Sequence, residues 1–263
     1  MSSTRRAIAI LDLLARRAPL GVRAVAQQLE LPLGSVHRIL LDLAEENVVE
    51  RTPEGDWDLS LRLFEITGRQ LDRIQWPRLV RPFAEKIAET TRETVNVSAL
   101  SGGFGICIDK VRGNEGMQLD APIGSGGPLY CGGAGKAMLA MSEAEQARIF
   151  SAPLKALTRH TITDHDALRA EIDAIRRRGY SIDNEEVVMG VHCVGVPIID
   201  RNGHPVGAIS ISGPSPKAPG PALDALVAML TPACGMVSRK LGYTGPWPPV
   251  ESAPAETPRR KAG

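Results

Sequence analysis

Apolar positions in the first fifty residues recur at intervals of three and four, which is the period of an amphipathic helix. One such stripe occupies residues 4–17 and stops before Pro19 and Gly21, a second occupies 22–29, and a third occupies 33–46. Two short helices joined by a tight turn are typical of a helix-turn-helix. We therefore predict three helices, of which the second and third form this motif.

The third predicted helix presents polar residues on one face near its N-terminal end. Ser35 and Arg38 lie one turn apart on that face, and His37 lies beside them. In a recognition helix a hydroxyl can contact either base of a pair, and an arginine can hold guanine O6 and N7 in a fork. Any solvent-exposed helix face can carry the same residue types, so this helix alone does not decide between a DNA contact and a plain surface.

A short hairpin follows the three helices. Residues 48–52 and 57–59 have strand character, and residues 53–56, Pro-Glu-Gly-Asp, form a turn between them. Three helices followed by such a hairpin make a winged helix-turn-helix, so we predict a DNA-binding domain over residues 1–62. Arg51 would lie on the wing, within reach of a phosphate or the minor groove, and a plain surface role fits it equally well. The candidate DNA contacts are Ser35, His37, Arg38 and Arg51.

Two further amphipathic helices follow the hairpin. The first, residues 61–74, ends at Pro77 and carries an apolar stripe of Leu61, Phe64, Ile66 and Leu71. An exposed stripe of this kind usually pairs with a copy of itself or with a neighbouring domain, so we assign residues 63–76 to a linker helix. The second helix is expected over residues 78–92.

The hydrophobic period then changes from helical to alternating. Strands are predicted at residues 94–100, 105–111, 117–121, 191–199 and 205–212, with extended chain at 180–183. Helices are predicted at residues 133–140, 142–150, 166–177 and 222–241. Strands in two groups with helices between them favour an α+β domain, an antiparallel sheet covered by helices, over residues 77–245. Residues 246–263 are rich in Pro and Ala and are predicted to be a disordered tail.

Small residues on two neighbouring strands leave space on one face of the predicted sheet. In the strand at 205–212 this face carries Val206, Ala208, Ser210 and Ser212, and in its partner it carries Cys193, Gly195 and Pro197. Such a face accommodates either a closely packed helix or a bound small molecule, and both interpretations remain open.

Residues 130–135, Tyr-Cys-Gly-Gly-Ala-Gly, form a glycine-rich turn that opens the helix at 133–140. Backbone N–H groups at a helix start attract anions, and the missing side chains let a ligand approach closely. The turn is not a P-loop, because Tyr130 and Ala137 stand where that motif needs Gly and Ser or Thr. Lys136 has no acidic partner evident in the sequence, which favours a solvated or structural lysine over a Schiff base. Two serine hydroxyls and a set of backbone donors suit a small carboxylate better than a nucleotide.

Composition limits the remaining possibilities. The formal net charge is +1, and residues 1–51 hold seven arginines against six carboxylates, so any DNA contact must come from a local patch or from a dimer. The four cysteines include no CxxC pair, so a zinc site is not supported and reduced thiols are expected. The chain has neither a signal-peptide pattern at its start nor a run of eighteen apolar residues, so we expect a cytoplasmic protein without a membrane partner.

With these residues placed, the chain resembles the IclR family of bacterial transcription regulators from about residue 4 to residue 241. The segments that carry the resemblance are 31–43 (LPLGSVHRILLDL), 126–140 (GGPLYCGGAGKAMLA), 179–198 (GYSIDNEEVVMGVHCVGVPI) and 206–214 (VGAISISGP). The resemblance implies a winged helix-turn-helix followed by an effector-binding domain similar to the GAF fold. It also implies a homodimer or a dimer of dimers on double-stranded operator DNA.

The resemblance also implies which residues hold a ligand. In members that bind small 2-oxo acids, the matching positions in this chain are Gly133, Ala134, Asp183, Cys193, Ser210 and Ser212. Aliphatic residues such as Leu119 and Val191 would line the rest of that pocket. Residues 130–132 depart from the family, because they read Tyr-Cys-Gly where many members have a His-centred run.

We therefore predict a DNA-binding regulator whose operator affinity depends on a 2-oxo or related carboxylic acid, with no cofactor. One alternative is an enzyme that uses Cys193, Lys136 or His192, although the sequence shows no set of nucleophile, base and orienting group. The other is a DNA-binding oligomer whose second domain binds no ligand.

Overall fold

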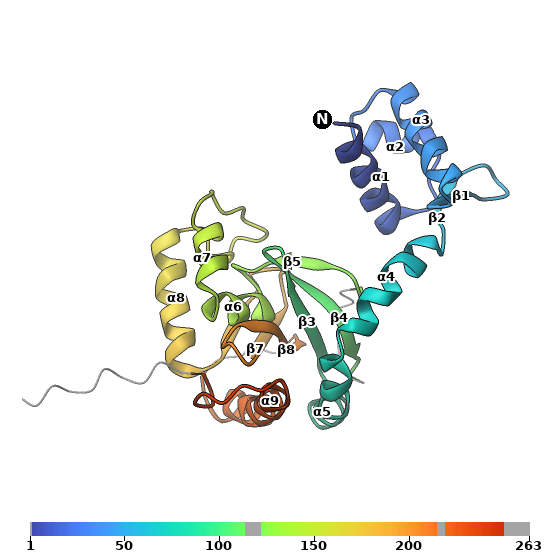
Figure 1. Ribbon diagram of the computed structural model, residues 1–263. Helices are drawn as coiled ribbons and strands as arrows, with labels where there is room; N and C mark the ends of the chain where they lie inside the picture. The colour runs from blue at the N-terminus through green and yellow to red at the C-terminus, as the bar shows by residue number, and fades with distance from the viewer. Residues whose placement is uncertain (1, 114–121, 215–218, 250–263) are drawn as a thin grey trace, which may run out of the picture. The chain divides into compact units, whose positions relative to one another are not determined.

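The computed structural model describes residues 2–113, 122–214 and 219–249. The chain divides into two compact units, Met1–Gln75 and Trp76–Gly263. The first unit contains the predicted winged helix-turn-helix and the second contains an antiparallel sheet with helices, so the predicted fold class is confirmed (Figure 1).

The first unit is built from three helices, a hairpin and a fourth helix. They are α1 (Ser3–Arg17), α2 (Val22–Gln28), α3 (Leu33–Glu45), β1 (Val49–Arg51), β2 (Trp57–Leu59) and α4 (Arg62–Arg73). The apolar stripes meet in one core, in which Ile10, Val36 and Trp57 are almost completely buried. Because Trp57 exchanges backbone hydrogen bonds with Leu20, the hairpin is fastened to the loop before α2.

The second unit has a six-stranded antiparallel sheet in the order β5-β4-β3-β8-β7-β6. The strands are β3 (Thr94–Ser101), β4 (Phe104–Val111), β5 (Gly126–Pro128), β6 (Ser181–Asn184), β7 (His192–Ile199) and β8 (Pro205–Gly213). The central strands β7 and β8 are buried along nearly their whole length, which explains their mostly apolar and small residues.

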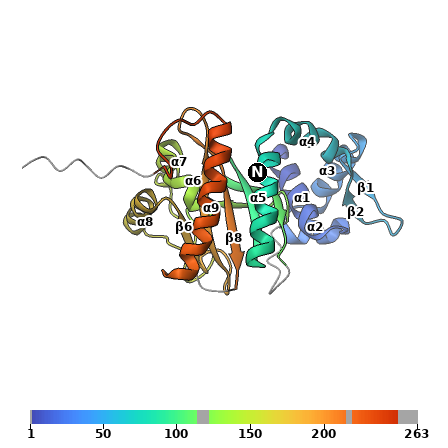
Figure 2. The same ribbon diagram turned by 90° about the horizontal axis from the view of Figure 1, so that it is seen from below.

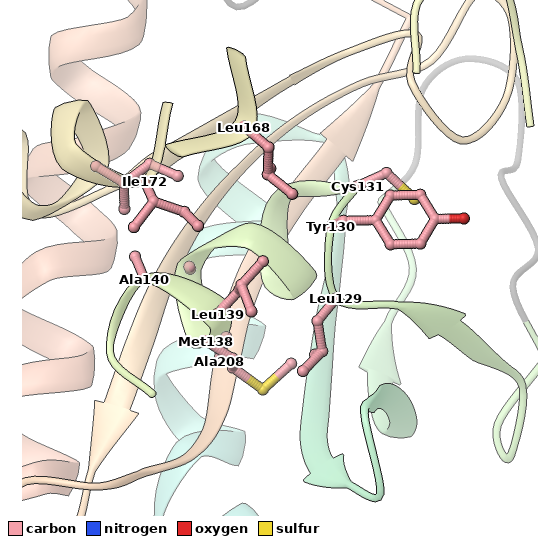
Figure 3. Packing of buried hydrophobic residues seen from close by; sticks show 11 residues of the cluster. Leu129, Tyr130, Cys131, Met138, Leu139, Ala140, Leu168, Ile172 and Ala208 are labelled. Carbon is pink, nitrogen blue, oxygen red and sulfur yellow. The ribbon is translucent and has the colours of Figure 1, made fainter. Parts of the chain in front are cut away.

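Helices cover both faces of this sheet. On one face α5 (Trp76–Thr91) and α9 (Pro221–Lys240) lie side by side, as Figure 2 shows. On the other face lie α6 (Gly133–Ala140), α7 (Glu143–Ile149) and α8 (His165–Arg178). The helix α6 is buried between the sheet and α8, where Met138 and Leu139 pack with Leu168 and Ile172 (Figure 3).

The helix α9 is unusually apolar, and one of its faces packs in the core of the second unit. Of the helices in the described part of the chain, it alone is long and apolar enough to cross a membrane, with a mean hydropathy of 1.4 over its most apolar stretch. Leu223, Leu230, Cys234 and Val237 are buried, and the Cys234 thiol lies 3.5 Å from the carbonyl oxygen of Val196 in β7. Packing against the sheet therefore accounts for the apolar residues on one face of this helix.

Several boundaries differ from those expected from the sequence. Pro77 does not end the linker helix; it lies in the first turn of α5, where proline is tolerated because that N–H has no helical partner. The strand β5 was not predicted, and the strand expected at 117–121 lies outside the described residues. Trp247 does not belong to a disordered tail, because it donates a hydrogen bond from Nε1 to the carbonyl oxygen of Thr231 at 2.8 Å; the rest of the expected tail, from residue 250, lies outside the described residues.

Gly195 in β7 provides a test of how closely α6 approaches the sheet. A Cβ atom at Gly195 would overlap the carbonyl group of Gly133 at the start of α6. We expect Gly195→Ala to lower the free energy of unfolding by about 1–3 kcal/mol, since backbone would have to move. Gly127→Ala is the matched control, because a Cβ there meets nothing within 4 Å. Urea unfolding measures both variants, and equal stabilities would contradict this account of the contact.

Candidate functional site

A cavity of about 380 Å³ lies where the N-terminal end of α6 meets the sheet. All six positions that the family resemblance singled out line it: Gly133, Ala134, Asp183, Cys193, Ser210 and Ser212. Val191 lines it as well, and Leu119 lies outside the described residues. The sequence left open whether the face of small residues on β7 and β8 meets a packed helix or a ligand space. In the structure α6 covers one part of this face and the cavity occupies the rest.

The strand register brings the polar groups together. Asp183 in β6 is paired with Cys193 in β7, and Cys193 is paired with Ser212 in β8, so these three side chains form a row across adjacent strands. A second row runs from Gly195 through Ser210 to Asn96 in β3. Because paired residues of antiparallel strands point to the same face, both rows face the cavity.

The N-terminal end of α6 brings backbone N–H groups to this cavity. Its N-cap residue is Gly132, with φ of 78°, and no side chain caps the helix. The first N–H groups of an α-helix have no partner within the helix and lie at the positive end of its dipole. The glycine-rich turn therefore presents backbone N–H groups that have no partner within the helix beside the hydroxyls of Ser210 and Ser212.

Burial sets the electrostatics of the cavity. It raises the pKa of the Asp183 carboxyl, and this shift is partly offset by a hydrogen bond of 2.8 Å that the backbone N–H of Glu186 donates to Asp183 Oδ1. Burial also raises the pKa of the Cys131 thiol to about 12 and raises that of Cys193 further. The thiols of Cys131 and Cys193 are therefore protonated near neutral pH, which disfavours them as nucleophiles.

Lys136 has acidic partners that the sequence did not reveal. Its side chain is 1% exposed, and Nζ lies 2.5 Å from Glu186 Oε1 and 3.2 Å from Glu171 Oε1. Arg178 also binds Glu171, at 2.9 Å. Lys136 is thus the centre of a buried ion-pair network and not a solvated lysine.

Some cavity residues were not identified from the sequence. Asn96 donates a hydrogen bond of 3.1 Å from Nδ2 to Ser212 Oγ, and Ser98 lies two residues further along β3. The alternation of polar and apolar residues from Thr94 to Ser98 is a signal for a polar face on β3, but it does not show that this face lines a cavity. Val187 and Val188 lie between β6 and β7 in a segment with no periodic signal.

In the first unit, the predicted contacts on α3 lie on an accessible face. His37 and Arg38 are exposed, and Ser35 is half-buried. Arg51 is also exposed, and its guanidinium lies 4.8 Å from the centre of the Trp57 ring, so packing on this ring holds it on the hairpin. The structure thus brings Ser35, His37 and Arg38 together on one helix and keeps Arg51 on the separate wing.

Arg6 of α1 is a neighbour of this face that the sequence did not indicate. It donates a hydrogen bond of 3.0 Å from Nη1 to Ser35 Oγ, and its Nε is buried without a hydrogen-bond partner. Among the described residues, no carboxylate pairs with this guanidinium. An anion that approached this helix N-terminus would meet both the positive end of the helix dipole and the Arg6 guanidinium.

Comparisons with known proteins agree with this architecture. The family model of the IclR helix-turn-helix domain matches residues 3–53, and the model of the bacterial transcriptional regulator IclR C-terminal domain matches residues 69–239. The transcriptional regulator KdgR of Escherichia coli is 29% identical over 246 residues, which cover 92% of this chain and 94% of KdgR. The acetate operon repressor of Salmonella typhimurium is 31% identical over 250 residues, which cover 93% and 91% of the two chains.

Solved structures show the same fold. The Thermotoga maritima IclR structure has a TM-score of 0.71 and 30% identity, and the match covers 92% of this chain and 99% of that one. An IclR homologue from Microbacterium hydrocarbonoxydans, complexed with 4-hydroxybenzoate, has a TM-score of 0.75 at 21% identity and covers 91% and 99%.

The two units together define a DNA-binding transcriptional regulator with a C-terminal effector-binding domain. The chain belongs to the IclR family, which confirms the resemblance read from its sequence motifs. The enzyme alternative is not supported, since the matching curated relatives named above are a regulator and a repressor.

Glu186 should make the stability of the protein depend on pH. Its pKa is raised from 4.5 to about 7, mainly by burial, so the folded protein holds a proton that the unfolded chain has already lost. The stabilisation is complete below about pH 4.5 and is lost as the pH rises through about 7. Relative to Glu186→Gln, the wild type should lose roughly 2–3 kcal/mol of unfolding free energy over this range.

Urea unfolding at several pH values between about 4.5 and 8 tests this dependence. Glu89→Gln is the control, because Glu89 is exposed and pairs only with the exposed Lys86 in the described structure. Parallel pH profiles for the wild type and Glu186→Gln would show that Glu186 does not titrate in this range.

Proposed function

We propose that this regulator binds double-stranded operator DNA through α3 and the wing, and that a small organic acid in the cavity changes this binding. The observation that carries the proposal is that six positions from four separate parts of the chain line one cavity beside an uncapped helix start. The protein would act in the cytoplasm, where its operator lies.

The cavity would bind a carboxylate without using a cationic side chain. No Lys, Arg or His is among the described residues that line it, so the α6 N–H groups and the hydroxyls of Ser210 and Ser212 would hold the anion. Asp183 would then accept a hydrogen bond from a donor elsewhere on the ligand, or share a proton with it, because two bare carboxylates repel. The 4-hydroxybenzoate bound by the Microbacterium homologue is an acid of this general kind.

At the DNA, each contact would have a separate role. Arg38, at the exposed face of α3, would read base edges, with His37 and the Ser35 hydroxyl beside it. Arg51 would meet the backbone or the minor groove from the wing. Arg6, already fixed to Ser35 Oγ, would bind a phosphate next to the recognition helix.

The two functions would be coupled through an assembly of several copies. A homodimer, or a dimer of dimers, would place two α3 helices in successive major grooves and compensate for the small net charge of each unit. The exposed Leu61, Phe64 and Ile66 on or beside α4 suit a contact between copies. An acid can shift DNA affinity only as far as it binds the two arrangements differently, typically by about 1–3 kcal/mol.

Removing both cavity hydroxyls should weaken the acid response. In Ser210→Ala/Ser212→Ala we expect the affinity for a bound acid to fall about tenfold to a hundredfold or more, because two hydrogen bonds to its carboxylate are lost. A thermal-shift screen of small organic acids identifies an acid that raises the melting temperature of the wild type. The same measurement then compares this increase between the wild type and the variants. Ser101→Ala, at an exposed serine that ends β3 outside the cavity lining, is the control. A wild type that no acid stabilises would favour a DNA-binding oligomer without a ligand.

Replacing Arg6 should remove one phosphate contact in each half-site. We expect Arg6→Gln to reduce the slope of log affinity against log salt concentration by about 1 per half-site, while Arg6→Lys largely keeps it. Fluorescence anisotropy with a duplex selected by the protein measures this slope. Arg38→Ala should instead relax sequence preference, and Arg16→Gln, whose side chain pairs with Asp12, should change neither. An unchanged slope for Arg6→Gln would exclude the phosphate role.

A further inference from the structure

We propose that the effector is a monocarboxylic acid with an uncharged body about the size of an aromatic ring, and not a three-carbon 2-oxo acid. This inference rests on the proposed function, because it specifies the ligand of the same cavity. It is carried by the size of the cavity, by the direction in which its unused space extends, and by the absence of a second anion-binding group in its described wall.

The cavity is too large for a three-carbon acid. A cavity of about 150 Å³ accommodates benzene, which has six non-hydrogen atoms. Pyruvate also has six, whereas the cavity measures about 380 Å³. An acid that fills more of it needs more atoms than pyruvate, since unfilled apolar space forfeits packing contacts.

The unused space extends away from Asp183, across the sheet towards β5. The row of Asp183, Cys193 and Ser212 occupies β6, β7 and β8, whereas Cys107 and Gly127 line the cavity from β4 and β5. In the strand order, β5 is three strands beyond β8, which corresponds to roughly 14 Å along the sheet. A carboxylate held at Ser212 therefore leaves this far end for the rest of the ligand.

Gly127 shows that the far end is open. It is paired with Gly105, and a Cβ at Gly105 would meet Cε of Met138 in α6. Since paired residues point to the same face, a Cβ at Gly127 would also point towards α6 and the cavity. Nothing lies within 4 Å of that position. The absence of a side chain at Gly127 thus leaves space at this end of the cavity.

Among the described residues, the far end carries no charged side chain. Ser98, Cys107, Ser125 and Gly127 line it, and burial raises the pKa of the Cys107 thiol, so that group is neutral near pH 7. The nearest ammonium group of the α6 region, Lys136 Nζ, is already bound by Glu186 and Glu171. A second carboxylate on the ligand would lose its water without gaining a partner.

Apolar groups line the space that would contain the uncharged body of the acid. Val187, Val188 and Val191 line the cavity from the segment around the start of β7. Bare glycine backbone at Gly126 and Gly127 offers a flat surface without projecting side chains. Together they suit a ring or a similarly compact apolar body, while hydroxyl-rich sugar acids would leave most of their hydroxyls unpaired.

Calorimetric titration of the full-length protein with three probe acids tests the inference. Benzoate has a neutral ring, pyruvate has three carbons, and 2-oxoglutarate is extended but carries a second carboxylate. We expect benzoate to bind about tenfold tighter than either of the others, because only benzoate extends an uncharged body towards the far end.

The variant Gly127→Leu should fill the far end and leave the hydroxyl end intact. We expect it to weaken benzoate about tenfold or more and to change pyruvate by less than about twofold. Gly34→Leu adds the same side chain in the first unit, where nothing lies within 4 Å of the new Cβ, and should change neither affinity. The melting temperature of Gly127→Leu checks that it is folded, and the wild-type ranking of the acids does not depend on this variant.

The possible outcomes separate this inference from the proposed function. Pyruvate or 2-oxoglutarate binding as tightly as benzoate, or Gly127→Leu weakening benzoate and pyruvate equally, would overturn the inference and leave an acid-sensing cavity. Binding of none of the three acids by the wild type would overturn both. The expected ranking together with selective loss of benzoate would support both.

Discussion

The close contact between Gly133 and Gly195 is the constraint on which the cavity depends. A side chain at Gly195 would overlap the backbone of α6, so the helix reaches this strand only because the position is bare. The contact is reinforced by Ser181 Oγ, which donates a hydrogen bond to the carbonyl oxygen of Gly133. It brings the uncapped N–H groups of α6 up to β7, beside Cys193 and Ser212. Anion-binding donors and cavity hydroxyls are thus positioned by one tight backbone packing.

The buried ion pairs of Lys136 fix the part of the cavity wall that contains Asp183. Lys136 binds Glu186, and the backbone N–H of Glu186 in turn donates to Asp183 Oδ1, so a residue of α6 orients the acidic group of the cavity through a neighbouring loop. Thr161 donates to the carbonyl oxygen of Glu186 and fixes the same loop from a third segment. Buried ion pairs are weak evidence for stability, because desolvation opposes their attraction. Their effect here is to fix the geometry of Asp183 and of the valines that follow Glu186.

Local pattern predicted most of the elements, and long-range contacts account for what it missed. The helices of the first unit and the strands β7 and β8 follow from periodicity, because each buries one continuous stripe or run. β5 has three residues, two of them glycine, so no alternation is visible. The partners of Lys136 lie 35 and 50 residues away, and sequence spacing carries no information about them. Likewise, motifs indicated Ser210 and Ser212, whereas the open far end at Gly127 depends on its pairing with Gly105.

The order of elements along the chain suggests how the proposed acid could act on α3. Asn96 and Ser98 line the cavity from β3, and β3 directly follows α5 in the sequence. The helix α5 begins at Trp76, whose ring lies against Gly207 of β8, a strand that also carries Ser210 and Ser212. Only Ile74 and Gln75 separate α5 from α4. A ligand held at Ser212 whose body extends towards β5 would meet β3, the strand that directly follows α5. A three-carbon acid confined to Ser210 and Ser212 would not reach β4, so the size of the effector and its capacity to bias the linker helix are aspects of the same geometry.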